Sequence, residues 1–139
     1  MNTSQDILIT LSGENSMPTT DFVATLFDGR SNPNKVTVAF TMAVNALKKG
    51  HSATIILMVE AVELGKPDAT KGLDIGAPFD PVSALLGKFL EMGGRIAICA
   101  SCLQHNGMQP ADMAPEYAII TAADVIDLLM HAKGSLQVS

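Results

Sequence analysis

The feature that most constrains the fold of this chain is the alternation of short apolar runs with segments of helical periodicity. The run "SATIILMV" at 52–59 is continuous and rich in β-branched residues, as expected of a strand buried on both faces of a sheet. We predict strands at 21–27, 52–59, 95–100 and 117–121. Apolar side chains recur with helical spacing at 34–49, at 81–92 and from Thr121 through Leu129. Regular alternation of this kind predicts an α/β sandwich with a mainly parallel sheet and helices on both faces.

Two stretches lie outside this alternation. Residues 1–20 contain a strand-like run, "DILITL" at 6–11, followed by a polar segment, and we interpret them as an N-terminal extension to a domain spanning 21–139. Residues 61–80 form a long connection, for which we expect one short helical turn and then a loop.

The composition restricts the cellular location and the partners that we expect for the protein. Hydrophobic residues make up 47% of the 139 residues and charged residues only 17%. The longest apolar run is interrupted by Glu60, and the first residues are polar and acidic, so we expect a cytoplasmic protein with no membrane segment. The apolar excess predicts a homo-oligomer. A net charge of −5 argues against nucleic acid as a partner, because phosphate neutralisation needs clustered Lys and Arg.

The candidate site is built around the only two cysteines, Cys99 and Cys102, in "GGRIAICASCLQHNGM" at 93–108. Cys99 falls at the carboxyl end of a predicted strand, the edge where open α/β sheets bind ligands. Ser101 and Gln104 have capping-box spacing, which predicts that Ser101 is an N-cap and that Cys102 is the first residue of a short helix. A thiolate is favoured at such a position, so we expect Cys102 to be the more reactive thiol, with a lowered pKa. His105, one turn further on, could act as its proton partner.

The same pattern has less specific interpretations. Cysteine is often buried as a small hydrophobic residue, so the pair could be inert. Cys99, Cys102 and His105 supply three metal ligands where a structural zinc site needs four, so we predict neither a metal nor another cofactor. The remaining histidines, His51 and His131, are interpreted as surface or packing residues.

Several of these segments together resemble the DsrE/DsrF-like family, and the resemblance covers about residues 22–135. The matching features are Gly29 and Pro33, "TVAF" at 37–40, Glu60 in "VEAV", the final "AADVIDLL", and above all the stretch from Gly94 to Gly107. Stand-alone members, which are related to the TusD-type sulfur-relay subunits, often carry this Cys-x-x-Cys with a Gly five residues later. They often have Arg just before that Gly, where this chain has Asn106 and therefore lacks a cation near Cys102.

The resemblance implies a flavodoxin-like, three-layer fold and a homo-oligomer, commonly a trimer or hexamer. It also implies a cysteine that accepts sulfane sulfur as a persulfide and exchanges it with sulfur donor and acceptor proteins. Spacing back from Gly107 favours Cys99 as that cysteine, whereas the helix-terminus argument favours Cys102. The alternative function is an oligomeric module that binds a small ligand or a protein and keeps both cysteines inert. The sequence leaves open whether the chain is an enzyme, such as a sulfurtransferase, or a carrier subunit.

Overall fold

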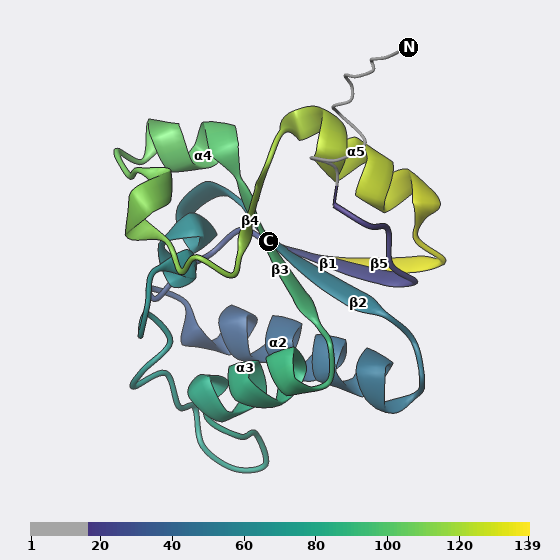
Figure 1. Ribbon diagram of the computed structural model, residues 1–139. Helices are drawn as coiled ribbons and strands as arrows, with labels where there is room; N and C mark the ends of the chain where they lie inside the picture. The colour runs from purple at the N-terminus through teal and green to yellow at the C-terminus, as the bar shows by residue number, and fades with distance from the viewer. Residues whose placement is uncertain (1–16) are drawn as a thin grey trace.

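The centre of the sheet is β2 (Ala53–Leu57), every residue of which is buried in the computed structural model; the model describes residues 17–139. The sheet has five strands in the order β4-β3-β2-β1-β5, and every neighbouring pair is parallel (Figure 1). The other strands are β1 (Phe22–Leu26), β3 (Arg95–Cys99), β4 (Ala118–Ile120) and β5 (Gly134–Val138). The parallel sheet inferred from the apolar runs is therefore confirmed.

Helices cover both faces of this sheet. Helices α2 (Pro33–Lys48) and α3 (Val82–Glu91) lie side by side on one face, and α5 (Ala122–His131) covers the other (Figure 1). The chain moves from β1 to β4 in one direction and then returns past β1 to β5. Because β-α-β crossovers are right-handed, this reversal places α5 on the opposite face from α2 and α3. The three-layer α/β arrangement is thus confirmed.

Each face has its own apolar core. The core under α2 and α3 includes Phe40 and Phe89, whose rings meet edge-on with centroids 6.4 Å apart. The core under α5 is smaller and includes Ile56, Ile120 and Leu128. Side chains therefore alternate between the two cores along the central strands, as the two-sided burial of a parallel sheet requires.

Local capping sets where the helices begin and end. The hydroxyl of Thr121 accepts from the backbone N–H of Asp124 at 3.3 Å, and the Asp124 carboxylate accepts from the Thr121 N–H at 3.0 Å. These two bonds form a capping box, which fixes the start of α5. Helix α3 ends at a Schellman motif: Gly93 has a φ of 93°, and the Gly94 N–H donates to the Phe89 carbonyl at 2.8 Å.

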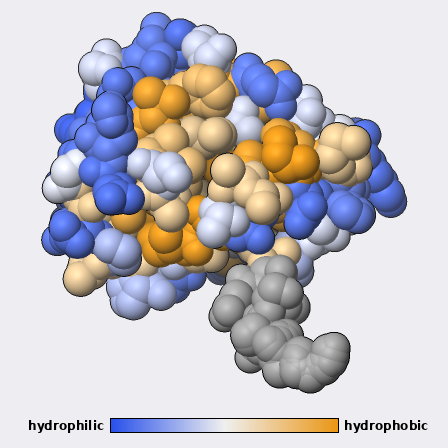
Figure 2. Space-filling view, turned by 90° about the horizontal axis from the view of Figure 1, so that it is seen from above, coloured by the Kyte–Doolittle hydropathy of each residue, from blue (hydrophilic) through white to orange (hydrophobic). Residues whose placement is uncertain are grey.

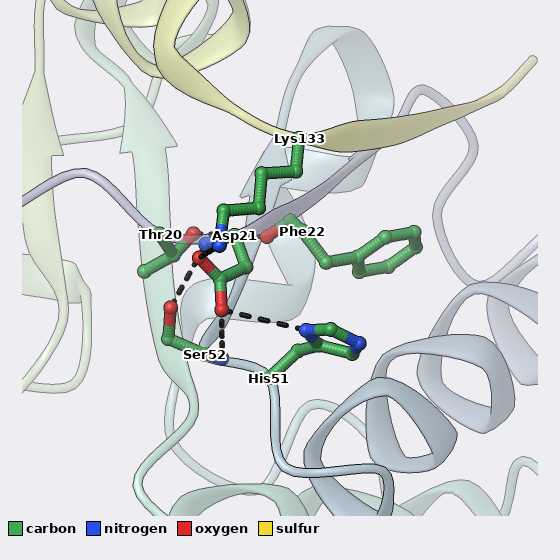
Figure 3. A network of polar contacts seen from close by, with 6 residues as sticks. All are labelled: Thr20, Asp21, Phe22, His51, Ser52 and Lys133. Atoms are coloured by element: carbon green, nitrogen blue, oxygen red, sulfur yellow. Dashed lines mark hydrogen bonds and ion pairs between the residues drawn. The ribbon is translucent and has the colours of Figure 1, made fainter.

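The fifth strand, β5, is absent from the sequence-based prediction. Its residues are mostly exposed and carry few apolar side chains, because among residues 17–139 β5 is an edge strand that pairs with β1 alone. Its start is held by Asp21: the Asp21 carbonyl accepts from the Lys133 N–H at 2.8 Å, and the carboxylate lies 3.5 Å from Lys133 Nζ. The same carboxylate accepts from the Ser52 N–H and contacts His51, which joins the amino ends of three strands (Figure 3).

The long connection begins as predicted with a short helical segment. It is the 3-10 helix η1 (Val59–Gly65), and a second one, η2 (Pro110–Asp112), precedes β4. The strand-like run at 6–11 lies outside the described residues. None of the helices within residues 17–139 has the length and apolar character needed to cross a membrane.

Candidate functional site

Cys99 and Cys102 lie at the carboxyl end of β3, where the strand passes directly into helix α4 (Ala100–His105). Cys99 is the last residue of the strand and only 5% exposed, whereas Cys102 is partly exposed. Both are free thiols. The two side chains interact with each other, so they form one site in which only Cys102 is open to a reagent.

The structure corrects the predicted helix start. Ser101 is the second residue of α4 and not its N-cap; the N-cap is Cys99, which makes no side-chain capping bond. Cys102 is consequently the third helical residue instead of the first. The capping-box spacing of Ser101 and Gln104 is misleading here because the strand continues into the helix without an intervening loop.

The expectation of a lowered pKa for Cys102 is also wrong. Burial raises the pKa of the Cys102 thiol above its usual value. Hydrogen bonding by the backbone N–H of Val59 acts in the opposite direction, and the neighbouring Cys99 adds to the increase. The contribution of a helix only six residues long is small. Cys102 is therefore favoured as a nucleophile by access and not by acidity.

The other candidate residues differ in their setting. His105 is the exposed last residue of α4. Glu60 is exposed near the start of η1, which packs against α4. Within residues 17–139, no group of three or more His, Cys, Asp or Glu side chains is arranged to hold a metal ion. His51 and His131 are exposed: His51 contacts Asp21, and Nδ1 of His131 lies 2.8 Å from the Asp127 carbonyl.

Two residues at the site are important in ways that the sequence did not reveal. Val59 follows the carboxyl end of β2 and has a φ of 54°, a left-handed conformation that is unfavourable for a β-branched residue. Asn106 is the C-cap of α4, and its side-chain amide donates to the Val59 carbonyl at 3.3 Å and to the Cys102 carbonyl at 2.8 Å. The sequence indicated Asn106 only as the position of a missing cation, and no local pattern predicts the conformation of Val59.

Two cavities of the described residues are lined by residues other than the two cysteines. One of about 330 Å³ runs along another side of α4, lined by residues that include Ala100, Gln104 and Ile119. A larger one, of about 720 Å³, is lined by residues such as Arg95 and Tyr117 at the amino ends of β3 and β4.

The fold and the site together make the chain a small parallel α/β protein with a partly exposed thiol at the carboxyl edge of its sheet. The family model of the DsrE/DsrF-like family matches residues 23–137, and the chain belongs to this family. Membership supports a role related to sulfur relay in general. No curated protein is matched by the sequence.

Solved structures share the fold at low sequence identity. The YchN protein of E. coli superposes with a TM-score of 0.66 at 15% identity, covering 87% of this chain and 99% of that one. A conserved protein of unknown function from Bacteroides thetaiotaomicron gives 0.59 at 16% identity, covering 84% and 94%. A protein of unknown function from Methanobacterium thermoautotrophicum gives 0.60 at 13% identity, covering 84% and 97%. These likenesses show the shared fold alone.

Proposed function

We propose that the chain is a cytoplasmic sulfur carrier that holds sulfane sulfur as a persulfide on Cys102. The observation that carries this proposal is the partly exposed Cys102 beside the buried Cys99, at the carboxyl edge of the sheet of a DsrE/DsrF-like protein. Access favours Cys102 over Cys99 in this proposal, because a donor must bring its sulfur into line with the attacking thiolate.

The proposed reaction is an exchange between thiols and a persulfide. The Cys102 thiolate attacks the outer sulfur of a donor persulfide, R–S–SH. A bond forms between Cys102 Sγ and that sulfur, the donor S–S bond breaks, and the donor leaves as a thiolate. An acceptor thiolate then attacks the outer sulfur of the Cys102 persulfide and regenerates the Cys102 thiolate. No external oxidant or reductant is needed, since the transferred sulfur keeps its oxidation state.

Cys99 offers a competing route for a loaded chain that meets no acceptor. Its thiol lies next to Cys102. Attack by Cys99 on Cys102 Sγ would form a Cys99–Cys102 disulfide and release the outer sulfur as sulfide. Cys99 is only 5% exposed and is therefore less open than Cys102 to an incoming donor. We therefore assign Cys99 a supporting position and Cys102 the carrier role.

Loading of the purified protein tests the proposal. After incubation with glutathione persulfide, peptide mass spectrometry should show one added sulfur atom on Cys102 in the wild type and in Cys99→Ser, but none in Cys102→Ser. Loading should be faster at higher pH, because the thiolate is the nucleophile and the pKa of Cys102 is raised.

Two other results would contradict the assignment. Sulfur found on Cys99 in the Cys102→Ser protein, at the wild-type rate, would move the carrier role to Cys99. No gain on either cysteine of the folded protein would favour the binding module with inert thiols.

A further inference from the structure

Cys99 and Cys102 occupy two defined positions at the start of α4. Cys99 is the N-cap and has extended backbone, and Cys102 is the third helical residue, the position called N3. Side chains at these two positions lie side by side in a capping box, because the N-cap side chain turns toward the N3 backbone and the N3 side chain reaches back toward the N-cap. Two cysteines with this placement form a spatial pair at the carboxyl end of β3.

Helix α5 shows what the same two positions look like elsewhere in this chain. Thr121 is its N-cap, with extended backbone like that of Cys99, and Asp124 is its N3 residue. The Thr121 hydroxyl donates to the Asp124 carboxylate at 3.0 Å, so the two side chains are in direct contact. An extended N-cap that leads into a helix therefore brings the N-cap and N3 side chains together, and α4 has this backbone arrangement at its two cysteines.

The backbone here also suits a disulfide. Cα atoms three residues apart in a helix are separated by about 5 Å, and disulfides usually join Cα atoms about 4.4–6.8 Å apart. Both cysteines are free thiols. Cys99 is fixed by its pairing with Ile120 of β4, and the Cys102 carbonyl accepts from the Asn106 N–H at 3.0 Å. Closing a disulfide therefore requires rotation of the two side chains and little movement of the backbone.

The two thiols differ in access as a two-step closure requires. Cys102 is partly exposed and open to a small molecule, whereas Cys99 is only 5% exposed. A reagent has to reach the first thiol alone, because the second step takes place within the chain. The burial of Cys99 therefore allows closure, and it disfavours capture of Cys99 by a second reagent molecule.

We propose that Cys99 and Cys102 form a dithiol–disulfide couple that reacts with low-molecular-weight disulfides. The Cys102 thiolate attacks one sulfur of a disulfide R–S–S–R, a mixed disulfide forms, and one thiolate RS⁻ leaves. The Cys99 thiolate then attacks Cys102 Sγ, the mixed S–S bond breaks, and the second RS⁻ leaves. The two cysteines are oxidised and the small disulfide is reduced to two thiols, which take up through solvent the protons that the cysteines release.

This activity goes beyond the proposed carrier role. Carrying sulfur leaves the oxidation state of the chain unchanged, and the route that releases sulfide starts from a loaded chain, whereas the couple starts from two free thiols. Closure removes the Cys102 thiolate on which sulfur loading depends. The couple thus stops sulfur loading under oxidising conditions and restores it when a thiol reductant reopens the disulfide.

Equilibration of the purified protein with reduced and oxidised glutathione tests the proposal. After an acid quench, free thiols are alkylated and intact masses are measured without reductant. We expect the wild type to lose two hydrogen atoms and to hold no glutathione, and Cys99→Ser to stop at one glutathione on Cys102. Cys102→Ser should stay reduced, because Cys99 is buried. If Cys99→Ser does not fold, Cys99→Ala gives the same test.

A shifted thiol provides the matched control. The double variant Cys102→Ser, Ser101→Cys keeps two cysteines, but the second stands at an exposed position one residue earlier in α4. Successive helical residues are turned by about 100° around the helix axis, so this thiol points away from Cys99. Its equilibrium constant for closure should be at least about tenfold below that of the wild type, a difference of about 30 mV in reduction potential.

Four results overturn the proposal. The wild type stays reduced in excess oxidised glutathione, it keeps glutathione on Cys102, it forms disulfides between chains, or the shifted variant closes as readily as the wild type. Loading of the reduced wild type with glutathione persulfide is measured separately. Loading without closure contradicts the couple alone, and closure without loading contradicts the proposed function alone.

Discussion

At the scale of single residues, the site depends on features that lie outside local sequence pattern. The apolar run before Cys99 correctly predicted that Cys99 lies at the carboxyl end of a strand. The raised pKa of Cys102 was not predictable, because it depends on how deeply the thiol is buried and on which backbone groups approach from η1. The raised pKa of Cys102 reflects that burial, which outweighs the N–H of Val59.

The contacts of Asn106 were also not predictable from local sequence. In the sequence it is notable only for the Arg that it replaces. Strands β2 and β3 are neighbours in the sheet, so their carboxyl ends lie side by side and Val59 lies beside α4. This placement allows the two hydrogen bonds of the Asn106 amide. A contact between residues 47 positions apart is set by the sheet register and not by any motif.

At the scale of elements, most of the fold could be predicted. The four apolar runs became β1 to β4, and the bounds of α2 and α3 agree with the helical periodicity to within one residue. The strands are buried on both faces and the helices are amphipathic, so burial produces a clear pattern of apolar residues in their sequences. Strand β5 shows no such pattern, because it is a polar edge strand. Its position depends on backbone pairing with β1 and on the contacts of Asp21.

Two glycines provide a prediction at this scale: Gly87 lies inside α3, and Gly94 lies just after its end. A Cβ on Gly94 would meet the ring of Phe89, which is fully buried and cannot move easily, whereas a Cβ on Gly87 would have no neighbour within 4 Å. We expect Gly94→Ala to lower the free energy of unfolding by about 1–3 kcal/mol, the cost of overpacking. Gly87→Ala should raise it by roughly 0.5–1 kcal/mol, since Gly87 lies inside a helix.

Urea unfolding followed by circular dichroism measures both variants of this pair. If both substitutions changed the free energy of unfolding equally, the close packing of Gly94 against Phe89 would not be what holds α3 against the start of β3.

At the scale of the whole molecule, the surface retains exposed apolar side chains. On α5, Met130 is 77% exposed and Ile126 is 57% exposed, and Ile119 on the edge strand β4 is 36% exposed. Figure 2 looks onto the face that carries α5 and shows apolar residues gathered between polar ones. Covering such a surface with further copies of the chain would account for the apolar composition.

We therefore expect a homo-oligomer, a trimer or hexamer, whose contacts include α5. Light scattering at micromolar concentration should give the mass of three or six chains, and the double variant Ile126→Glu, Met130→Glu should reduce that mass. Met42→Glu, on α2 and 47% exposed, is the matched control on the other face and should leave the mass unchanged. A monomeric wild type would refute the expectation, and an unaffected double variant would exclude α5 from the contacts.

The central claim is that Cys102 carries sulfur and passes it on, and a sulfur balance tests it most directly. Wild-type protein is loaded with glutathione persulfide, freed of the donor and mixed with a protein or small-molecule thiol acceptor. Intact mass spectrometry then follows the chain and the acceptor together. We predict that the chain loses one sulfur atom and returns to its unloaded mass while the acceptor gains that sulfur as a persulfide. Release of the sulfur as sulfide, with the chain left as a Cys99–Cys102 disulfide even when acceptor is abundant, would contradict the account.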